Sequence, residues 1–146
     1  MLVANHSVVT LRPLNLDEDY PLLMEWWRVR GGTLLVKEIF PGTGAVAYVD
    51  NRPVAMSFLY CDRDGRLAFI EWTSTNPAKD IRARNKLAAV KALFEHLTME
   101  ARLFGCSCVL SLVAPNGSED HLLKKMGWAP SAQSDVPHVM FGKRLR

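Results

Sequence analysis

The chain has 146 residues, of which 49% are hydrophobic and 23% are charged, values typical of one globular domain with its own core. Composition excludes disorder, collagen and a coiled coil as descriptions of the whole chain, and no apolar run reaches the ~18 residues of a membrane span. The first residues lack the basic-then-apolar order of a signal peptide. We therefore expect a single domain over residues 1–146, located in the cytoplasm and without a membrane partner.

Charge and cysteine content exclude further classes. The chain carries 18 Lys and Arg against 15 Asp and Glu, a net charge of +3. This excess suits a small anionic ligand, but it is too small for a nucleic-acid surface and no nucleic-acid motif accompanies it. Three cysteines (Cys61, Cys106 and Cys108) are too few and too irregular for a disulfide framework, and a lone Cys-x-Cys lacks the second ligand pair of a zinc site. We expect buried, unreactive thiols, no metal and no nucleic-acid partner.

The first part of the chain predicts a strand, a helix and a loop. A β-branched apolar run over 8–11 indicates the strand, and apolar residues three and four apart indicate a helix over 16–30. Asn15 followed by Glu18 is a capping-box pattern, which marks the start of that helix. The stretch 31–44 is rich in glycine and proline and therefore predicts a loop, with a short helix around 34–38.

The rest of the chain predicts a meander followed by alternating helices and strands. Turn residues separate three strands, which we place at 45–49, 54–61 and 67–75. Apolar residues recur at helical spacing from Leu87 to Phe104 and predict a long helix over 81–104. A strand at 107–113, a helix at 116–126 with Asn116 as its cap, and a last strand at 136–145 complete the chain.

The element order β-α-β-β-β-α-β-α-β predicts an α/β (α+β) domain. Strand–helix–strand connections imply parallel pairing, whereas hairpins imply antiparallel pairing. We therefore expect a mixed, mostly antiparallel central sheet with helices on both faces. The chain has no internal repeat, low-complexity segment or linker, which agrees with one domain.

The helix near the C-terminus carries a family resemblance. Residues 116–128 read NGSEDHLLKKMGW. They resemble the Asn-x-x-Ala-x-x-Leu-Tyr-x-Lys-x-Gly-Phe pattern of many GCN5-related N-acetyltransferases (the GNAT superfamily). Asn116, Leu122, Lys125 and Gly127 match in register, and Trp128 replaces one aromatic residue by another. The long central helix also looks like that of the family, so the resemblance covers nearly the whole chain. It extends to small GNAT-like proteins of bacteriophages, several of which share a glycine-poor loop.

The resemblance implies an enzyme that uses acetyl-CoA as co-substrate and transfers its acetyl group to a primary amine by direct attack. A glutamate on the third meander strand serves several GNAT enzymes as general base, and here that residue is Glu71. The alternative for Glu71 is a surface carboxylate paired with lysine or arginine. The resemblance places the acyl oxygen near backbone N–H groups of Thr73, Ser74 and Thr75. It leaves open a small-molecule or a peptide amine as acceptor, and a homodimer as the assembly.

The chain departs from the family at the loop that binds the cofactor pyrophosphate. The family pattern, Gln/Arg-x-x-Gly-x-Gly/Ala, falls within 76–87, where this chain has no glycine. Glycines let backbone N–H groups approach phosphates at a helix N-terminus, and cationic side chains can bind phosphate instead. We therefore expect the cofactor to contact polar and cationic residues of this stretch and of the later helix: Lys79, Arg82, Arg84, Asn85, Lys86 and Asn116. The alternative is an ordinary solvated helix face.

A second departure concerns the proton that the leaving thiolate needs. The tyrosine that often serves as general acid falls at Leu123, which has no proton to donate. Tyr60, His138 and solvent are the alternatives. If the chemistry is absent, the chain is a catalytically impaired GNAT-fold protein that acts by protein–protein contact. The acceptor pocket is expected at the 31–44 loop, with Trp26 lining it and Trp27 in the core.

Overall fold

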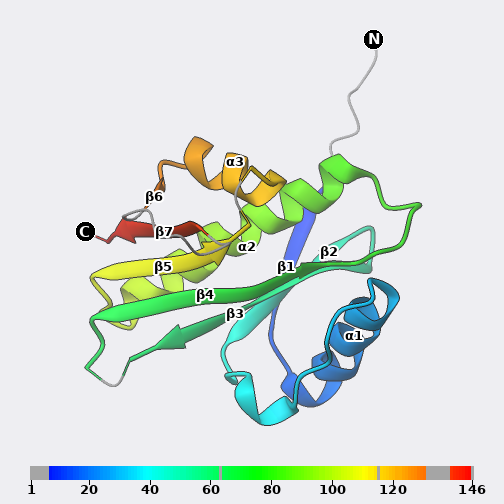
Figure 1. Ribbon diagram of the computed structural model, residues 1–146, viewed down its shortest axis with the longest axis horizontal. Helices are drawn as coiled ribbons and strands as arrows, with labels where there is room; N and C mark the ends of the chain where they lie inside the picture. Colours follow the sequence, from blue (N-terminus) through cyan, green and yellow to red (C-terminus); the bar gives the residue numbers. More distant parts are fainter. Residues whose placement is uncertain (1–6, 63, 115, 131–138, 146) are drawn as a thin grey trace.

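The computed structural model describes residues 7–62, 64–114, 116–130 and 139–145, which form one sheet with helices on both faces (Figure 1). Its strands are β1 (Val9–Pro13), β2 (Gly44–Val49), β3 (Arg52–Cys61), β4 (Leu67–Thr75), β5 (Cys108–Val113), β6 (Ala129–Pro130) and β7 (Val139–Arg144). Its helices are α1 (Leu16–Val29), the 3-10 turn η1 (Lys37–Ile39), α2 (Ala83–Leu103) and α3 (Ser118–Lys125). The predicted class and element order are confirmed, with the short β6 as an addition.

The seven strands lie in the order β1-β2-β3-β4-β5-β7-β6. Every neighbouring pair is antiparallel except β4 and β5, which are parallel. The parallel pair follows from connectivity, because α2 carries the chain back across the sheet between these two strands. The expected mixed, mostly antiparallel sheet is therefore confirmed.

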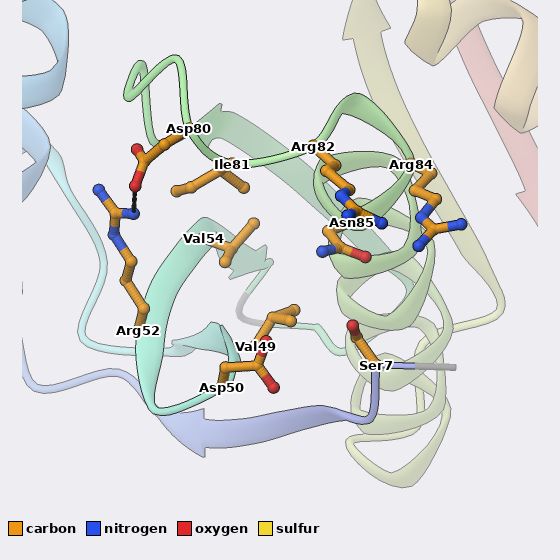
Figure 2. A pocket seen from close by; sticks show the side chains of 10 residues that line it. All are labelled: Ser7, Val49, Asp50, Arg52, Val54, Asp80, Ile81, Arg82, Arg84 and Asn85. Carbon is orange, nitrogen blue, oxygen red and sulfur yellow. Dashed lines mark hydrogen bonds and ion pairs between the residues drawn. The ribbon is translucent and has the colours of Figure 1, made fainter. Parts of the chain in front are cut away.

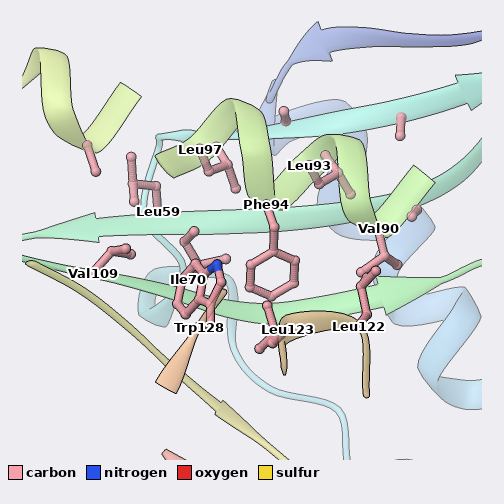
Figure 3. Packing of buried hydrophobic residues seen from close by; sticks show 14 of the residues in the cluster. Leu59, Ile70, Val90, Leu93, Phe94, Leu97, Val109, Leu122, Leu123 and Trp128 are labelled. Atoms are coloured by element: carbon pink, nitrogen blue, oxygen red, sulfur yellow. The ribbon is translucent and has the colours of Figure 1, made fainter. Parts of the chain in front are cut away.

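The core has two parts, one on each face of the sheet. Helices α2 and α3 cover one face, and Val90, Phe94 and Leu97 of the predicted stripe are buried there (Figure 3). Phe94 meets Trp128 edge-on, with ring centroids 5.6 Å apart. The ends of the stripe differ from the prediction, because Leu87 and Phe104 lie at the ends of α2 and are 42% and 58% exposed. Helix α1 covers the other face over a smaller cluster of side chains from α1, β2 and β3.

The start of α1 is capped differently from the prediction. The backbone N–H of Asn15 donates to the Oδ2 atom of Asp19 at 2.8 Å, and neither Asn15 nor Glu18 makes the expected side-chain cap bond. Asp19 is 2% exposed and accepts two hydrogen bonds from Arg12, at 3.0 and 2.7 Å. These bonds raise the pKa of Arg12 well above its usual value. A buried, fully paired carboxylate thus joins β1 to α1.

The start of α3 also corrects the sequence prediction. The helix begins at Ser118 with Gly117 at its N-cap position, so Asn116 is not the cap. Asn116 has a φ of 60°, a left-handed turn conformation, and its backbone N–H donates to Asp120 Oδ2 at 2.6 Å. The helix phase then buries Leu123 completely. Residues 136–138 of the predicted last strand, with His138, lie outside the described residues.

Two further sequence predictions concern the cysteine thiols and membrane-spanning helices. Cys106 is buried as expected, but Cys61 at the end of β3 is exposed, which corrects that part of the thiol prediction. Partial desolvation, followed by the neighbouring Cys106 thiol, nevertheless raises the pKa of Cys61 to about 11. None of the helices within the described residues combines the length and apolar composition needed to cross a bilayer.

Candidate active site

The parallel strands β4 and β5 separate part-way along their length. They pair only from Leu67 to Phe69, and beyond that point a cavity of about 380 Å³ opens beside them. Side chains replace strand pairing there: Ser111 Oγ donates to the Ile70 carbonyl at 2.7 Å, and the Leu112 N–H donates to Glu71 Oε1 at 2.9 Å. The β4 edge beyond these bonds has no strand partner on the β5 side among the described residues.

A β-bulge in β4 sets the direction of the side chains at this opening. Met56 pairs with Ser74 but Phe58 pairs with Glu71, so β4 carries one more residue than β3 between these pairs. Trp72 in the bulge has a φ of 58°. Its ring packs on the α1 face, whereas Ile70 is buried in the core under α2 and α3. Strict alternation along a strand would place Ile70 and Trp72 on one face, and the bulge instead turns them to opposite faces.

Two carboxylates meet at the cavity. Glu71 from β4 and Glu119 from α3 both line it, and neither has a cation within 4 Å in the described parts of the chain. Burial raises the pKa of Glu71 to about 6, although the Leu112 N–H partly opposes this shift. Burial, and then the negative charge of Glu71, raise the pKa of Glu119 to about 7. The pair is therefore poised to exchange protons near neutral pH.

A second cavity of about 360 Å³ adjoins the first, because Glu119 lines both. It lies between the beginnings of α2 and α3. Arg84 and Lys86 give it a cationic part, and Leu87 and Val90 give it an apolar wall. The two cavities together lead from cations at the start of α2 to carboxylates at the strand opening.

Arg30, at the end of α1, adds to the positive charge at the second cavity. Its Nη2 donates to Thr75 Oγ1 at 2.8 Å. Burial, followed by repulsion from Arg30, lowers the pKa of Lys86. Neither cation has an ion-pair partner within 4 Å in the described segments. Such uncompensated charge favours an anionic ligand, and no local sequence signal connects Arg30 with Thr75.

The cationic and polar residues expected to bind the cofactor are divided between two places. Arg82 and Asn85 line a third cavity of about 410 Å³ on another side of the α2 start (Figure 2). Lys86 lines the second cavity, and Arg84 borders both. Asn116 is exposed and lines none of these three cavities. The expected roles of Arg82, Asn85 and Asn116 remain predictions.

The strand residues expected to hold the acyl group also differ in position. Thr73 lines the first cavity and Thr75 the second. The Ser74 side chain is buried and points elsewhere: its hydroxyl accepts a hydrogen bond from Trp27 Nε1 and donates to the Trp72 carbonyl, each at 2.9 Å. Any contact of Ser74 with a ligand would therefore use its backbone.

The relative burial of the two adjacent tryptophans is the opposite of the sequence prediction. Trp26 is 3% exposed and belongs to the core under α1, so it cannot line an open pocket. Trp27 is half-buried and packs against Phe40 and Trp72, with centroids 5.9 and 5.8 Å away. Tyr60 joins this aromatic group by accepting a hydrogen bond from Trp72 Nε1 at 2.8 Å. The helix phase that buries Leu23 and Trp26 together explains the exchange.

Comparison with known proteins gives matches of structure and none of sequence. No family model matches the chain, and no curated protein matches it. The structure matches yncA, a putative acetyltransferase from Salmonella typhimurium with its cofactor acetyl-CoA, with a TM-score of 0.72 over 94% of both chains at 13% identity. It matches an acetyltransferase of the GNAT family from Streptococcus pneumoniae with a TM-score of 0.69, over 95% of this chain and all of the other, at 14% identity. Ard1 from Thermoplasma volcanium gives a TM-score of 0.71 over 94% and 98% of the chains at 15% identity. The chain has the GNAT fold.

The GNAT fold is present here with both departures predicted from the sequence. Asn76 shapes the glycine-less stretch: its side chain donates to the Pro53 carbonyl at 2.9 Å and accepts the Ala78 N–H at 3.0 Å. Leu123 packs in the core and carries no titratable group. Glu119, which the sequence analysis did not single out, is a further candidate residue at the strand opening. Its signal was a carboxylate at a position where the family pattern has alanine.

Proposed function

We propose that the chain binds acetyl-CoA and transfers its acetyl group to a primary amine, with Glu71 as general base. One observation carries the proposal: Glu71 lies at the opening between β4 and β5, without an ion-pair partner among the described residues, with a pKa raised to about 6. A carboxylate whose pKa lies near the working pH is the group that general-base catalysis requires. The fold likeness to a protein that binds acetyl-CoA supports the choice of co-substrate.

The adjoining cavities suggest a path for the cofactor. The anionic phosphates would bind near Arg30, Arg84 and Lys86, three cations for which the described part of the chain supplies no ion-pair partner. The flexible arm would then follow the apolar wall formed by Leu87 and Val90. On this path the thioester would lie at the strand opening. There the β4 edge over residues 73–75, which has no partner on the β5 side among the described residues, would offer backbone N–H groups to the acyl oxygen.

The chemistry begins with a neutral amine, because an ammonium group has no lone pair with which to attack. Above pH 6 Glu71 is mostly ionised and accepts a proton from the ammonium form of the acceptor, directly or through water, which leaves the neutral amine. The nitrogen then attacks the thioester carbonyl carbon, a C–N bond forms, and the C–S bond breaks. The products are an amide and the CoA thiolate, which takes up a proton.

The acceptor is expected to approach from the aromatic side of the opening. Trp72 lines the cavity and is 37% exposed, and Trp27 and Phe40 pack behind it. An aromatic wall beside a carboxylate suits an amine attached to an apolar or cationic group. We propose a small-molecule or peptide amine, and a homodimer remains part of the same proposal.

Calorimetric titration with acetyl-CoA tests this function, followed by measurement of thiol release. The amine panel would contain the amino acids, spermidine, kanamycin and a peptide with a free N-terminus. Binding with acceptor-dependent thiol release is the expected result. Absence of binding would contradict the proposal and favour a non-catalytic GNAT-fold protein that acts by protein contact. Binding without thiol release from any amine would contradict the catalytic role of Glu71.

A further inference from the structure

We propose that Glu119 is the general acid of this site, protonating the departing CoA thiolate, and that it shares one proton with Glu71. This inference rests on the proposed acetyl transfer and assigns the role that Leu123 cannot fill. It concerns the carboxylate on α3 that adjoins both the base and the expected cofactor path.

The position of Glu119 is the first argument. Within the described residues, Glu119 alone lines both the cavity at the strand opening and the cavity leading to Arg84 and Lys86. The sulfur atom of a bound thioester joins the cofactor arm to the acyl group. It would therefore lie where the two cavities meet, next to Glu119.

The second argument is that three nearby hydroxyl groups, which are the alternative proton donors, already make hydrogen bonds. The Ser111 hydroxyl donates to the Ile70 carbonyl at 2.7 Å, and the Thr73 hydroxyl is hydrogen-bonded to Ser57 at 2.7 Å. The Tyr60 hydroxyl donates to the Ile39 carbonyl at 2.8 Å, and burial raises its pKa. Serine and threonine are also too weakly acidic to protonate a thiolate, whose thiol titrates near 8.5 in cysteine. A carboxyl group has the proton and the acidity that the step requires.

The charges around Glu119 keep that proton in place. Glu71 lines the first cavity with it from β4, and Arg84 and Lys86 share the second cavity with it from α2. Only burial and Glu71 shift its pKa, and both raise it. On its own helix, Asp120 is engaged by the Asn116 N–H at 2.6 Å and by Lys124 at 3.1 Å. Near neutral pH the two cavity carboxyls therefore hold about one proton between them.

The proton balance closes without an outside donor. Glu71 takes a proton from the acceptor's ammonium group before the C–N bond forms, and Glu119 gives one to sulfur as the C–S bond breaks. The pair ends with Glu71 protonated and Glu119 ionised. A proton passing from Glu71 to Glu119, directly or through water, restores the starting state. The nitrogen releases its last extra proton to solvent as the amide forms, so the net reaction converts an ammonium group and acetyl-CoA into an amide, free CoA thiol and one solvent proton.

The kinetic test compares wild type with Glu119→Gln, and with Glu95→Gln on the exposed side of α2 as control, at matched acetyl-CoA saturation. We expect Glu119→Gln to lose roughly 10²-fold in kcat, the lower end for general acids because a thiolate is already a fair leaving group. Wild-type kcat should fall on the alkaline side as Glu119 ionises near pH 7, and this limb should be absent from Glu119→Gln. The affinity for acetyl-CoA and the activity of Glu95→Gln should be unchanged.

A second measurement is independent of activity. Carbon-13 NMR of labelled glutamate carboxyls in the intact protein should show two groups titrating above pH 5, and Glu71→Gln should lower the upper pKa. A raised pKa in the folded state stabilises the protein at low pH, and this stabilisation is lost as pH rises through 7. Wild type should therefore lose more unfolding free energy between pH 5 and pH 8 than Glu119→Gln.

The outcomes separate this inference from the proposed function. If wild type releases thiol with an amine and Glu119→Gln keeps at least half of that rate, the acid role of Glu119 is wrong and acetyl transfer stands. If wild type releases no thiol with any acceptor, the proposed function fails and this inference fails with it. A Glu119 carboxyl that titrates below pH 5 would also overturn the inference, whatever the rates.

Discussion

Two pairs of acidic side chains in this protein differ in their surroundings. The difference separates acids that stabilise the fold from acids that can transfer protons. At the helix starts, Asp19 and Asp120 each accept the N–H of an asparagine four residues earlier, and each also binds a cation. At the strand opening, Glu71 and Glu119 line the same cavity without a cation within 4 Å among the described residues. The first arrangement favours the charged form of an acid, and the second opposes it.

The consequence is visible in the direction of the shifts. The Asn116 N–H and the Lys124 ammonium lower the pKa of Asp120 below its ordinary value. The pKa values of Glu71 and Glu119 are raised to about 6 and about 7. An acid supplied with donors stabilises the fold at neutral pH. An acid deprived of them costs stability there but gains the ability to transfer protons.

The largest expected effect is on turnover, from a substitution at the opening between β4 and β5. Glu71→Gln keeps the side-chain shape but removes the base, so we expect a loss of roughly 10²–10⁴-fold in turnover with acetyl-CoA affinity retained. The loss relative to wild type should shrink at higher pH, where the amine loses its proton unaided. Steady-state rates from pH 6 to 9 measure both effects. A variant that melts and turns over as wild type does would remove Glu71 from the mechanism.

Substitution of Asp19, the paired acid at the start of α1, should lower the stability of the protein without changing the catalytic step. Asp19→Ala leaves the Arg12 guanidinium and the Asn15 N–H without their partner, and we expect a loss of about 3 kcal/mol in unfolding free energy. This is the low end for a broken buried pair, because Arg12 still contacts water. Glu18→Gln is the matched control, since the exposed Glu18 makes no cap bond. Denaturant unfolding of both variants would contradict the assignment if the control lost as much.

The affinity for acetyl-CoA should show whether the phosphates bind in the second cavity, next to the strand opening, or in the third cavity. Removing one charge-assisted phosphate bond costs roughly 1.5–3 kcal/mol, so Lys86→Ala and Arg84→Ala should weaken acetyl-CoA binding by about 10- to 150-fold. The effect should be larger at low salt. Arg82→Ala, which changes only the third cavity, should lose less. Calorimetry showing the greatest loss in Arg82→Ala would move the phosphates to that cavity.

The smallest effect concerns Asn116 before α3. Its side chain makes no cap bond, and its φ of 60° is tolerated by asparagine and glycine better than by alanine. Asn116→Ala should therefore cost about 1 kcal/mol through backbone strain, whereas Asn116→Gly should leave the melting temperature nearly unchanged. An equal loss in both variants would show that the asparagine side chain itself stabilises the helix start.

The order of strands and helices could be predicted from the sequence, because periodicity and turn residues act over a few neighbouring positions. The 67–75 strand was predicted to the residue, and the apolar stripe of α2 was correct at Val90, Phe94, Leu97 and Ala101. Glu71 could be proposed as a base from its place on that strand and from the family resemblance. The sheet class follows from the connections between these elements.

Which acidic side chains can transfer protons depended on the tertiary structure alone. Glu18 and Asp19 are adjacent acids in a helix start, and only the position of Arg12 across from α1 selects Asp19 for burial. Glu119 meets Glu71 only because β4 bulges and parts from β5, which brings residues distant in sequence to one cavity. Burial and charge depend on every neighbour in space, and a pKa depends on both. Local spacing therefore determined where the chain is helical or extended, whereas packing determined which acids are paired and which remain able to move a proton.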